Sequence, residues 1–142
     1  MKVAIGCDHA GYELKEKVKA KLTNDGYEVV DVGTNSTDSV DYPIFGKAVG
    51  EKVATDECER GIAICGTGIG ISIACNKVKG VRAALCNTEH LAEMSREHND
   101  ANVLCLGARE IDHKLALKIV DKWFSTEFLG GKHLRRINML EQ

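Results

Sequence analysis

The sequence predicts an α/β fold in which one doubly wound parallel sheet carries helices on both faces. Five short apolar runs alternate with longer segments that have amphipathic, helix-like spacing. Several of the runs are apolar at consecutive positions, as is typical of parallel strands that are covered on both sides. Because this alternation repeats five times with no linker or low-complexity stretch, we expect residues 1–142 to form one domain.

The expected strands are short, and each precedes a candidate helix. The strands are expected at 3–5, 28–32, 61–65, 82–86 and 103–106. Apolar residues recur at every fourth position in the first two expected helices. The helices are expected at 14–22, 45–53, 71–78, 89–97 and 114–124. Gly26 stands where the first helix should stop, and Pro43 suits the first turn of the second.

A basic C-terminal arm, residues 130–142, follows the last of these helices. Gly130 and Gly131 break the pattern, and the segment from Lys132 to Arg136 then carries a cluster of cations. Two interpretations are open: a frayed, solvated end, or an arm that brings cations to an anion on the same or a neighbouring subunit.

The composition is that of a soluble globular protein. Hydrophobic residues make up 44%, charged residues 28%, and the net charge is −2. We therefore expect no nucleic-acid partner, and no membrane association because no apolar run approaches the ~20 residues of a span. The N-terminus has no signal-peptide pattern, so we expect a cytoplasmic location with most of the six cysteines reduced and buried. No C-x-x-C pair indicates structural zinc.

Polar and titratable side chains stand next to the ends of the expected strands. In an open α/β sheet, ligands bind at the carboxyl ends of the strands, so we expect these groups to converge on one rim. They are Asp8 and His9 after the first strand, Cys65 after the third, Asn87 after the fourth, His98 and Asn99 just before the fifth, and Arg109 just after it.

The loop 65–70, Cys-Gly-Thr-Gly-Ile-Gly, is the sharpest local signal. Its three glycines allow a tight turn that presents backbone N–H groups, and a helix is expected to begin there. Such a loop could hold a phosphate or an enediolate oxygen and would favour the thiolate of Cys65. The alternative is an ordinary glycine-rich turn with a buried cysteine, in which Thr67 and Ser72 bond their own backbone.

Three other loop chemistries do not match these residues. A dinucleotide fingerprint requires G-x-G-x-x-G, whereas glycines here occupy 66, 68 and 70. A Walker loop requires a lysine soon after its last glycine, and none follows. A cysteine phosphatase requires an arginine six residues after its nucleophile, where Ile71 stands.

Asp8, His9 and His98 each have a functional and a structural interpretation. Asp8 and His9 could bind a sugar hydroxyl or a phosphate, or they could cap the helix that follows. A lone histidine late in a helix is usually structural or merely exposed. Beside Asn99 on the expected rim, His98 is instead a candidate acid for opening a sugar ring.

Taken together, these segments make the chain closely resemble the ribose-5-phosphate isomerase B family, which belongs with the galactose-6-phosphate isomerase subunits. The similarity spans nearly the whole chain and ends with Gly130, Gly131 and the basic arm. The matching segments are 6–11 (GCDHAG), 41–43 (DYP), 64–72 (ICGTGIGIS), 76–77 (NK), 80–84 (GVRAA) and 95–103 (SREHNDANV).

The resemblance implies reversible conversion of D-ribose 5-phosphate to D-ribulose 5-phosphate, a step of the pentose phosphate pathway, without a metal or an organic cofactor. It implies a three-layer, Rossmann-like αβα fold with a five-stranded parallel sheet. It also implies a homodimer, often paired into a homotetramer, with the active site at a subunit interface.

The resemblance also assigns roles to individual residues. It implies that Cys65 is the base, that His98 is the ring-opening acid and that Thr67 aids ring opening. Some members use a glutamate further along the loop, but positions 69–71 hold no acid here, so the resemblance is to the cysteine branch. The implied substrate contacts are Asp8, His9, Gly66, Thr67, Gly68, Ile69, Gly70, Asn99 and Arg109.

One position departs from the family pattern. Members commonly carry two arginines in the arm as phosphate ligands; the second maps to Arg136, but the first falls on Lys132. A lysine keeps the charge and loses the bidentate fork, and Arg135 could compensate. Two alternative functions also stay open: an isomerase subunit for a hexose 6-phosphate such as allose or galactose 6-phosphate, and a non-catalytic sugar-phosphate-binding module.

Overall fold

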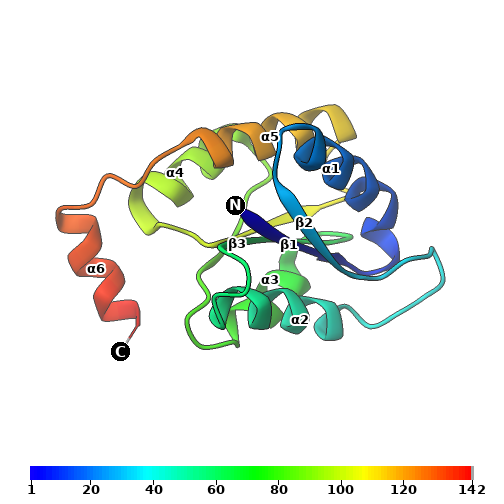
Figure 1. The fold of residues 1–142 in the computed structure, drawn as a ribbon, viewed down its shortest axis with the longest axis horizontal. Coiled ribbons are helices and arrows are strands. Elements are labelled where there is room, and N and C mark those ends of the chain that lie inside the picture. The colour runs from blue at the N-terminus through cyan, green and yellow to red at the C-terminus, as the bar shows by residue number, and fades with distance from the viewer. Residues whose placement is uncertain (142) are drawn as a thin grey trace.

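The computed structural model describes residues 1–141 and has the predicted three-layer α/β architecture (Figure 1). Its five strands are all parallel and lie in the order β2-β1-β3-β5-β4. Their bounds are β1 Lys2–Cys7, β2 Glu28–Gly33, β3 Arg60–Cys65, β4 Ala83–Leu85 and β5 Val103–Gly107. Every predicted strand is present, within two residues at either end. Gln142, the last residue of the predicted arm, lies outside the described residues.

Helices cover both faces of the sheet, as the alternation predicted. One layer holds α1, α4 and α5, and the other holds α2 and α3 (Figure 1). A short 3-10 turn, η1 (His9–Gly11), leads into α1. The α-helices are α1 Tyr12–Asn24, α2 Tyr42–Ala54, α3 Ile69–Asn76, α4 Glu89–Asn99, α5 His113–Ser125 and α6 Lys132–Leu140. In the described chain, no helix is long and apolar enough to cross a membrane.

The core is divided by the sheet because successive strand side chains point to opposite faces. On β1, Val3 and Ile5 pack with the α1 layer, whereas Ala4 packs with the α2 layer. Trp123 of α5 is fully buried in the first of these cores. All six cysteines are free and buried, which confirms the expectation of reduced thiols.

The local stop and start signals also behave as predicted. Gly26 follows the end of α1 with a φ of 94°, a conformation that a side chain would disfavour, and Pro43 lies in the first turn of α2. The tail is not frayed: α6 is a nine-residue helix in which Ile137 is buried. In Figure 1, α6 stands beside the end of α4, away from the loops that follow β1 and β2.

Candidate active site

The turn from β3 into α3 holds Cys65 at the carboxyl edge of the sheet. Cys65 is the last residue of β3, and Gly68, with a φ of 83°, starts α3. A Cβ on Gly68 would lie 2.4 Å from Leu85 Cδ1 and 2.9 Å from the carbonyl carbon of Leu106. Only glycine therefore fits at this position, and only three residues separate the end of β3 from the start of α3.

The sulfur of Cys65 differs from the other sulfurs in its surroundings. Its residue is 5% exposed, whereas no other cysteine exceeds 1%. The Gly68 N–H donates to its Sγ over 3.2 Å. Burial raises the pKa of Cys7 to about 12 and that of Cys86 to about 11, so both stay protonated near neutral pH. Cys65 is thus the most exposed of the six thiols, and its sulfur accepts a backbone N–H.

Some backbone N–H groups that follow Cys65 donate hydrogen bonds within the loop, and others have no acceptor in the described part of the chain. The Ile69 N–H donates to Thr67 Oγ1 over 3.2 Å. The Thr67 hydroxyl therefore bonds its own loop, as expected for an ordinary glycine-rich turn. Among residues 1–141, no hydrogen-bond acceptor is paired with the N–H groups of Gly70 and Ile71. These two donors, in the first turn of α3, are available to an anion.

Two further side chains lie against this loop. The backbone N–H of Arg109 donates to the Gly66 carbonyl over 2.9 Å, and its guanidinium covers Gly66, where an added Cβ would lie 3.3 Å from Nη1. Tyr42, at the start of α2, covers Gly70, where an added Cβ would lie 2.6 Å from Cζ. The structure therefore brings a cation and a phenol to the Cys65 loop.

Asp8 and His9 differ in the use of their side chains. The Asp8 carboxylate accepts the N–H groups of Ala10 and Gly11 at 3.0 and 3.2 Å, so it caps η1. The half-buried His9 accepts the Val40 N–H at Nδ1 over 3.2 Å. A neutral His9 ring accordingly carries its proton on Nε2, which is a hydrogen-bond donor.

His98 and Asn99 do not share this rim, so the expected convergence on one edge is wrong within a single chain. Cys65 pairs with Gly107 at the carboxyl end of β5, whereas Gly61 pairs with Val103 at its start. His98 and Asn99 precede Val103 and therefore lie at the amino edge. Five strand residues separate the two edges by about 13 Å.

A second group of polar residues surrounds His98 at the amino edge. Its ring stacks on that of His133, with centroids 4.4 Å apart and planes 14° apart. The pair lies in a cleft of about 440 Å³. The residues that line this cleft are His98, Asn99, Lys132, His133, Arg136, Ile137 and Leu140. Lys132 and Arg136 thus line the same cleft, whereas Arg135 is not among the lining residues.

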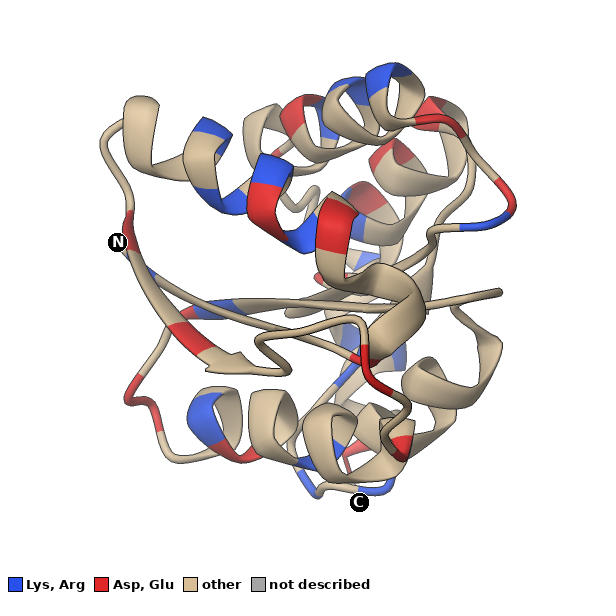
Figure 2. Ribbon diagram, turned by 90° about the vertical axis from the view of Figure 1, so that its right-hand side faces the viewer, with Lys and Arg blue, Asp and Glu red and all other residues tan. Residues whose placement is uncertain are grey.

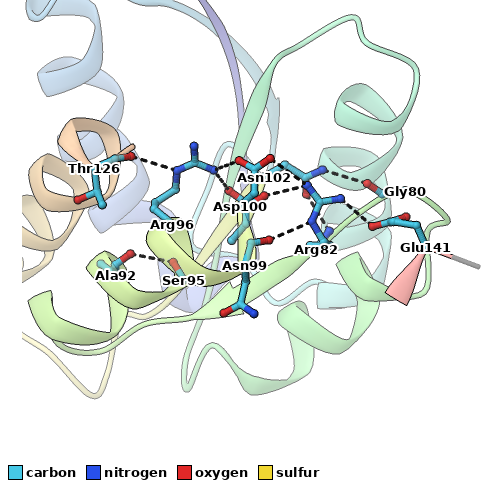
Figure 3. Close-up of polar contacts among 11 residues, drawn as sticks. Gly80, Arg82, Ala92, Ser95, Arg96, Asn99, Asp100, Asn102, Thr126 and Glu141 are labelled. Carbon is cyan, nitrogen blue, oxygen red and sulfur yellow. Dashed lines mark hydrogen bonds and ion pairs between the residues drawn. The ribbon is translucent and has the colours of Figure 1, made fainter. Parts of the chain in front are cut away.

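Two arginines hold the end of α4 next to this cleft (Figure 3). Arg82 donates to the carbonyls of Asn99 and Asp100 at 3.1 and 2.8 Å and to the Glu141 carboxylate at 2.7 Å. Arg96, only 5% exposed, donates to the Asp100 carboxylate at 2.8 Å and to a neighbouring backbone carbonyl. These contacts join β4, the end of α4 and the end of α6.

Our sequence-based assignment of functional groups missed three of these side chains. Tyr42 and Arg82 enter the sequence-based prediction only as parts of the matching segments, and His133 enters it only as part of the basic C-terminal arm. For His133 a signal exists: Lys132, His133 and Arg136 fall on one helical face, which an α-helical arm would turn toward one surface. Arg82 gives no comparable sequence signal, because its partners are backbone carbonyls and a distant carboxylate.

Comparison with known proteins places the chain, including both groups of residues, in a family of sugar isomerases. A sequence model of the ribose/galactose isomerase family matches residues 3–140. The chain belongs to this family. The chain is 46% identical over 139 residues to ribose-5-phosphate isomerase B of Escherichia coli. This alignment covers 98% of the chain and 93% of the E. coli protein.

Solved structures of ribose/galactose isomerase relatives superpose closely. Ribose-5-phosphate isomerase B of Clostridium thermocellum gives a TM-score of 0.98 at 55% identity, with 99% of this chain and 95% of that chain covered. The Mycoplasma genitalium enzyme, solved with bound ribulose-5-phosphate, gives 0.96 at 42% identity, with coverages of 99% and 93%. The family match includes the Cys65 loop at one edge and α6 at the other, so both groups belong to the shared fold.

His133 should report on anions in the amino-edge cleft. Partial burial, the neighbouring His98 ring and the cations of Lys132 and Arg136 lower the pKa of His133, while Glu97 opposes them. A bound phosphate should raise that pKa because it stabilises the imidazolium form. An NMR titration of His133 with and without inorganic phosphate measures the change. Arg136→Ala should reduce the phosphate-induced rise in the pKa of His133, and Arg135→Ala should leave it unchanged. A pKa of His133 that is the same with and without phosphate would contradict the assignment of this cleft as an anion site.

Proposed function

We propose that the chain is a ribose-5-phosphate isomerase that interconverts D-ribose 5-phosphate and D-ribulose 5-phosphate through an enediolate. The observation that carries the proposal is the free Cys65 thiol, bonded to the Gly68 N–H where α3 begins, with two unpaired N–H groups in the same turn. An aldose–ketose isomerase needs a base of this kind beside donors for an oxyanion. The E. coli relative and the structure with bound ribulose-5-phosphate support the choice of substrate.

The proton transfer is assigned to Cys65. As a thiolate, Cys65 removes the proton from C2 of the open-chain aldose. The electron pair of that bond forms the C1–C2 double bond, and the negative charge moves to O1. The proton on O2 then moves to O1 and the thiol returns its own proton to C1, which leaves a hydroxyl at C1, the ketone at C2 and the thiolate restored. The N–H groups of Gly70 and Ile71 stabilise the enediolate oxygen, and one such donor is worth roughly 3 kcal/mol.

Ring opening and phosphate binding are assigned to the other polar residues. His98 protonates the ring oxygen, with Thr67 assisting, and Asp8 and Asn99 contact sugar hydroxyls. Backbone of the 66–70 loop completes the sugar contacts. The phosphate is held by the cations and imidazole of four side chains: His9, Arg109, Lys132 and Arg136. Lys132 supplies a point charge where the family has a bidentate arginine, so phosphate affinity is kept with a changed geometry.

These roles require a second copy of the chain. Cys65 lies at the carboxyl edge and His98 at the amino edge of one sheet, so a homodimer that apposes the two edges would complete the site. Exposed apolar side chains lie on the helices next to both: Ile69 and Ile73 on α3 are each 55% exposed, and Leu134 on α6 is 49% exposed. Seen from the carboxyl edge, charged residues concentrate on the α1 layer, and the layer of α2 and α3 carries few (Figure 2). A homotetramer would pair two such dimers.

Related functions remain as alternatives to be tested. The family description names galactose as well as ribose, which favours a hexose 6-phosphate isomerase subunit as the second candidate. A non-catalytic binding module is disfavoured because Cys65, Thr67 and His98 are all present. We further propose that the chain acts in the cytoplasm as one domain, since a reducing compartment suits six free thiols.

A coupled assay decides among the substrates. The purified chain should convert ribose 5-phosphate faster than allose 6-phosphate or galactose 6-phosphate, and a chelator such as EDTA should leave the rate unchanged. A clear preference for a hexose phosphate would replace the pentose assignment. Loss of activity with EDTA would contradict a metal-free mechanism.

Cys65→Ala tests the base. The variant should lose about 10³-fold in kcat, within the range expected for removing a general base, while its thermal unfolding stays close to that of the wild type. Iodoacetamide should inactivate the wild type, and substrate should protect it. Cys58→Ala is the matched control, because Cys58 is a buried thiol whose pKa is raised mainly by burial. Near-normal turnover by Cys65→Ala would remove Cys65 as the base.

Mixing two inactive variants tests the shared site. When Cys65→Ala and His98→Ala subunits are co-expressed, one site of each mixed dimer joins an intact Cys65 to an intact His98. Random pairing should restore about a quarter of the wild-type activity per subunit. Each variant alone should be inactive, and purification by two different tags isolates the mixed dimer. If the mixed dimer stays inactive, Cys65 and His98 do not meet across a subunit interface.

A further inference from the structure

A fully buried lysine on α1 bonds the loop that follows β2. The side chain of Lys15 has no exposed surface. Its Nζ donates to both carboxylate oxygens of Asp31 at 3.0 Å, to the Thr34 carbonyl, and to Asn35 Oδ1 at 3.2 Å. The ammonium thus joins α1, β2 and the first two residues of the loop 34–41.

The same loop reaches the candidate active site at its far end. Residues 35–39 are exposed, and the loop then donates the Val40 N–H to His9 Nδ1. Directly after the loop, Tyr42 lies over Gly70 in the Cys65 loop. At its start, besides Lys15, only Cys7 holds the loop among the described residues: its carbonyl accepts the Thr34 N–H over 2.7 Å, and its Sγ lies 3.9 Å from the Thr34 oxygen.

The burial of Lys15 is hard to explain by stability alone. Taking an ammonium out of water costs several kcal/mol, and a buried ion pair often contributes no more than apolar residues of similar volume. Asp31 would be paired without Lys15, because Lys19 reaches the same carboxylate at 3.1 Å from a position 39% exposed. What Lys15 alone supplies is the pair of bonds to the loop, at Thr34 and Asn35.

We propose that Lys15 is a positioning residue for phosphate binding: by holding the start of the loop 34–41, it keeps the Val40 N–H on His9 Nδ1. His9 Nε2–H then faces the sugar phosphate as a donor. This inference rests on the proposed function for the role of His9 in phosphate binding. The geometry of the loop and the tautomer of His9 are independent of it.

Lys15→Met tests the proposal against Lys19→Met. Methionine matches the lysine stem in length and removes the ammonium. Lys15→Met should raise KM for ribose 5-phosphate about tenfold and change kcat less than about twofold, since binding and not chemistry is affected. Lys19→Met removes a cation from the same carboxylate without touching the loop and should leave both constants unchanged.

The tautomer of His9 gives a readout that loss of stability would not move. In ¹⁵N-labelled wild type, His9 Nδ1 should show the chemical shift of an unprotonated acceptor and Nε2 that of a protonated donor. In folded Lys15→Met the two tautomers should mix. If Lys15→Met does not fold, Asn35→Ala, which removes one exposed acceptor of Lys15, should shift KM and the tautomer in the same direction by less.

The outcomes separate this inference from the proposed function. An unchanged KM and tautomer in Lys15→Met, or equal effects in Lys19→Met, would overturn the positioning role. If the wild type does not isomerise ribose 5-phosphate, the proposed function fails. The tautomer measurement, repeated with inorganic phosphate as the probe, then still decides whether Lys15 sets the state of His9.

Discussion

The left-handed turn at Gly68 is the constraint on which the candidate site depends. It lets α3 begin after only three intervening residues, so the sulfur of Cys65 accepts the N–H of Gly68, the N-cap of α3. Leu85 and Leu106 close around Gly68 and leave no room for a side chain. A thiol in this position accepts a backbone N–H and lies at the favourable end of a helix dipole, whereas the thiols of Cys7, Cys75 and Cys86 lie against backbone carbonyls. Leu85 of β4 and Leu106 of β5 therefore restrict the turn that places the Gly68 N–H on the sulfur of Cys65.

The direction of the strands divides the remaining groups. In a parallel sheet, the residues that follow each strand lie at the carboxyl edge, and the residues that precede each strand lie at the amino edge. The Cys65 loop, His9 and Arg109 lie at the carboxyl edge, and His98 with the α6 cations lies at the amino edge. Each group lacks what the other supplies: one has the thiol and the N–H donors, the other has the imidazole pair and the arm cations. Exposed apolar residues lie on α3 and α6, the helices that carry the loop and the cations, and the proposed homodimer would bury them.

Buried and half-buried cations bond the backbone in both halves. Lys15 bonds the loop beside His9, and Arg82 and Arg96 bond the end of α4 beside His98. Such groups contribute little net stability, because desolvation offsets most of their attraction. They do restrict the backbone, since several donors on one side chain accept only one arrangement of carbonyls. Lys15 and Arg82 thus bond the backbone next to His9 and Asn99, which are proposed to contact the substrate.

The sequence alone determined the order and type of the elements, the loop at Cys65 and the family, because these depend on local periodicity, glycine spacing and contiguous motifs. Strand direction also decides which edge His98 occupies: His98 precedes β5, so it lies at the amino edge and not at the carboxyl edge expected from the sequence. Only the tertiary structure decided the stack of His98 on His133, the partners of Lys15 and the bond from Arg82 to Glu141, 59 positions away. Such contacts join segments distant in sequence, and no local pattern encodes which backbone carbonyl a buried cation will meet.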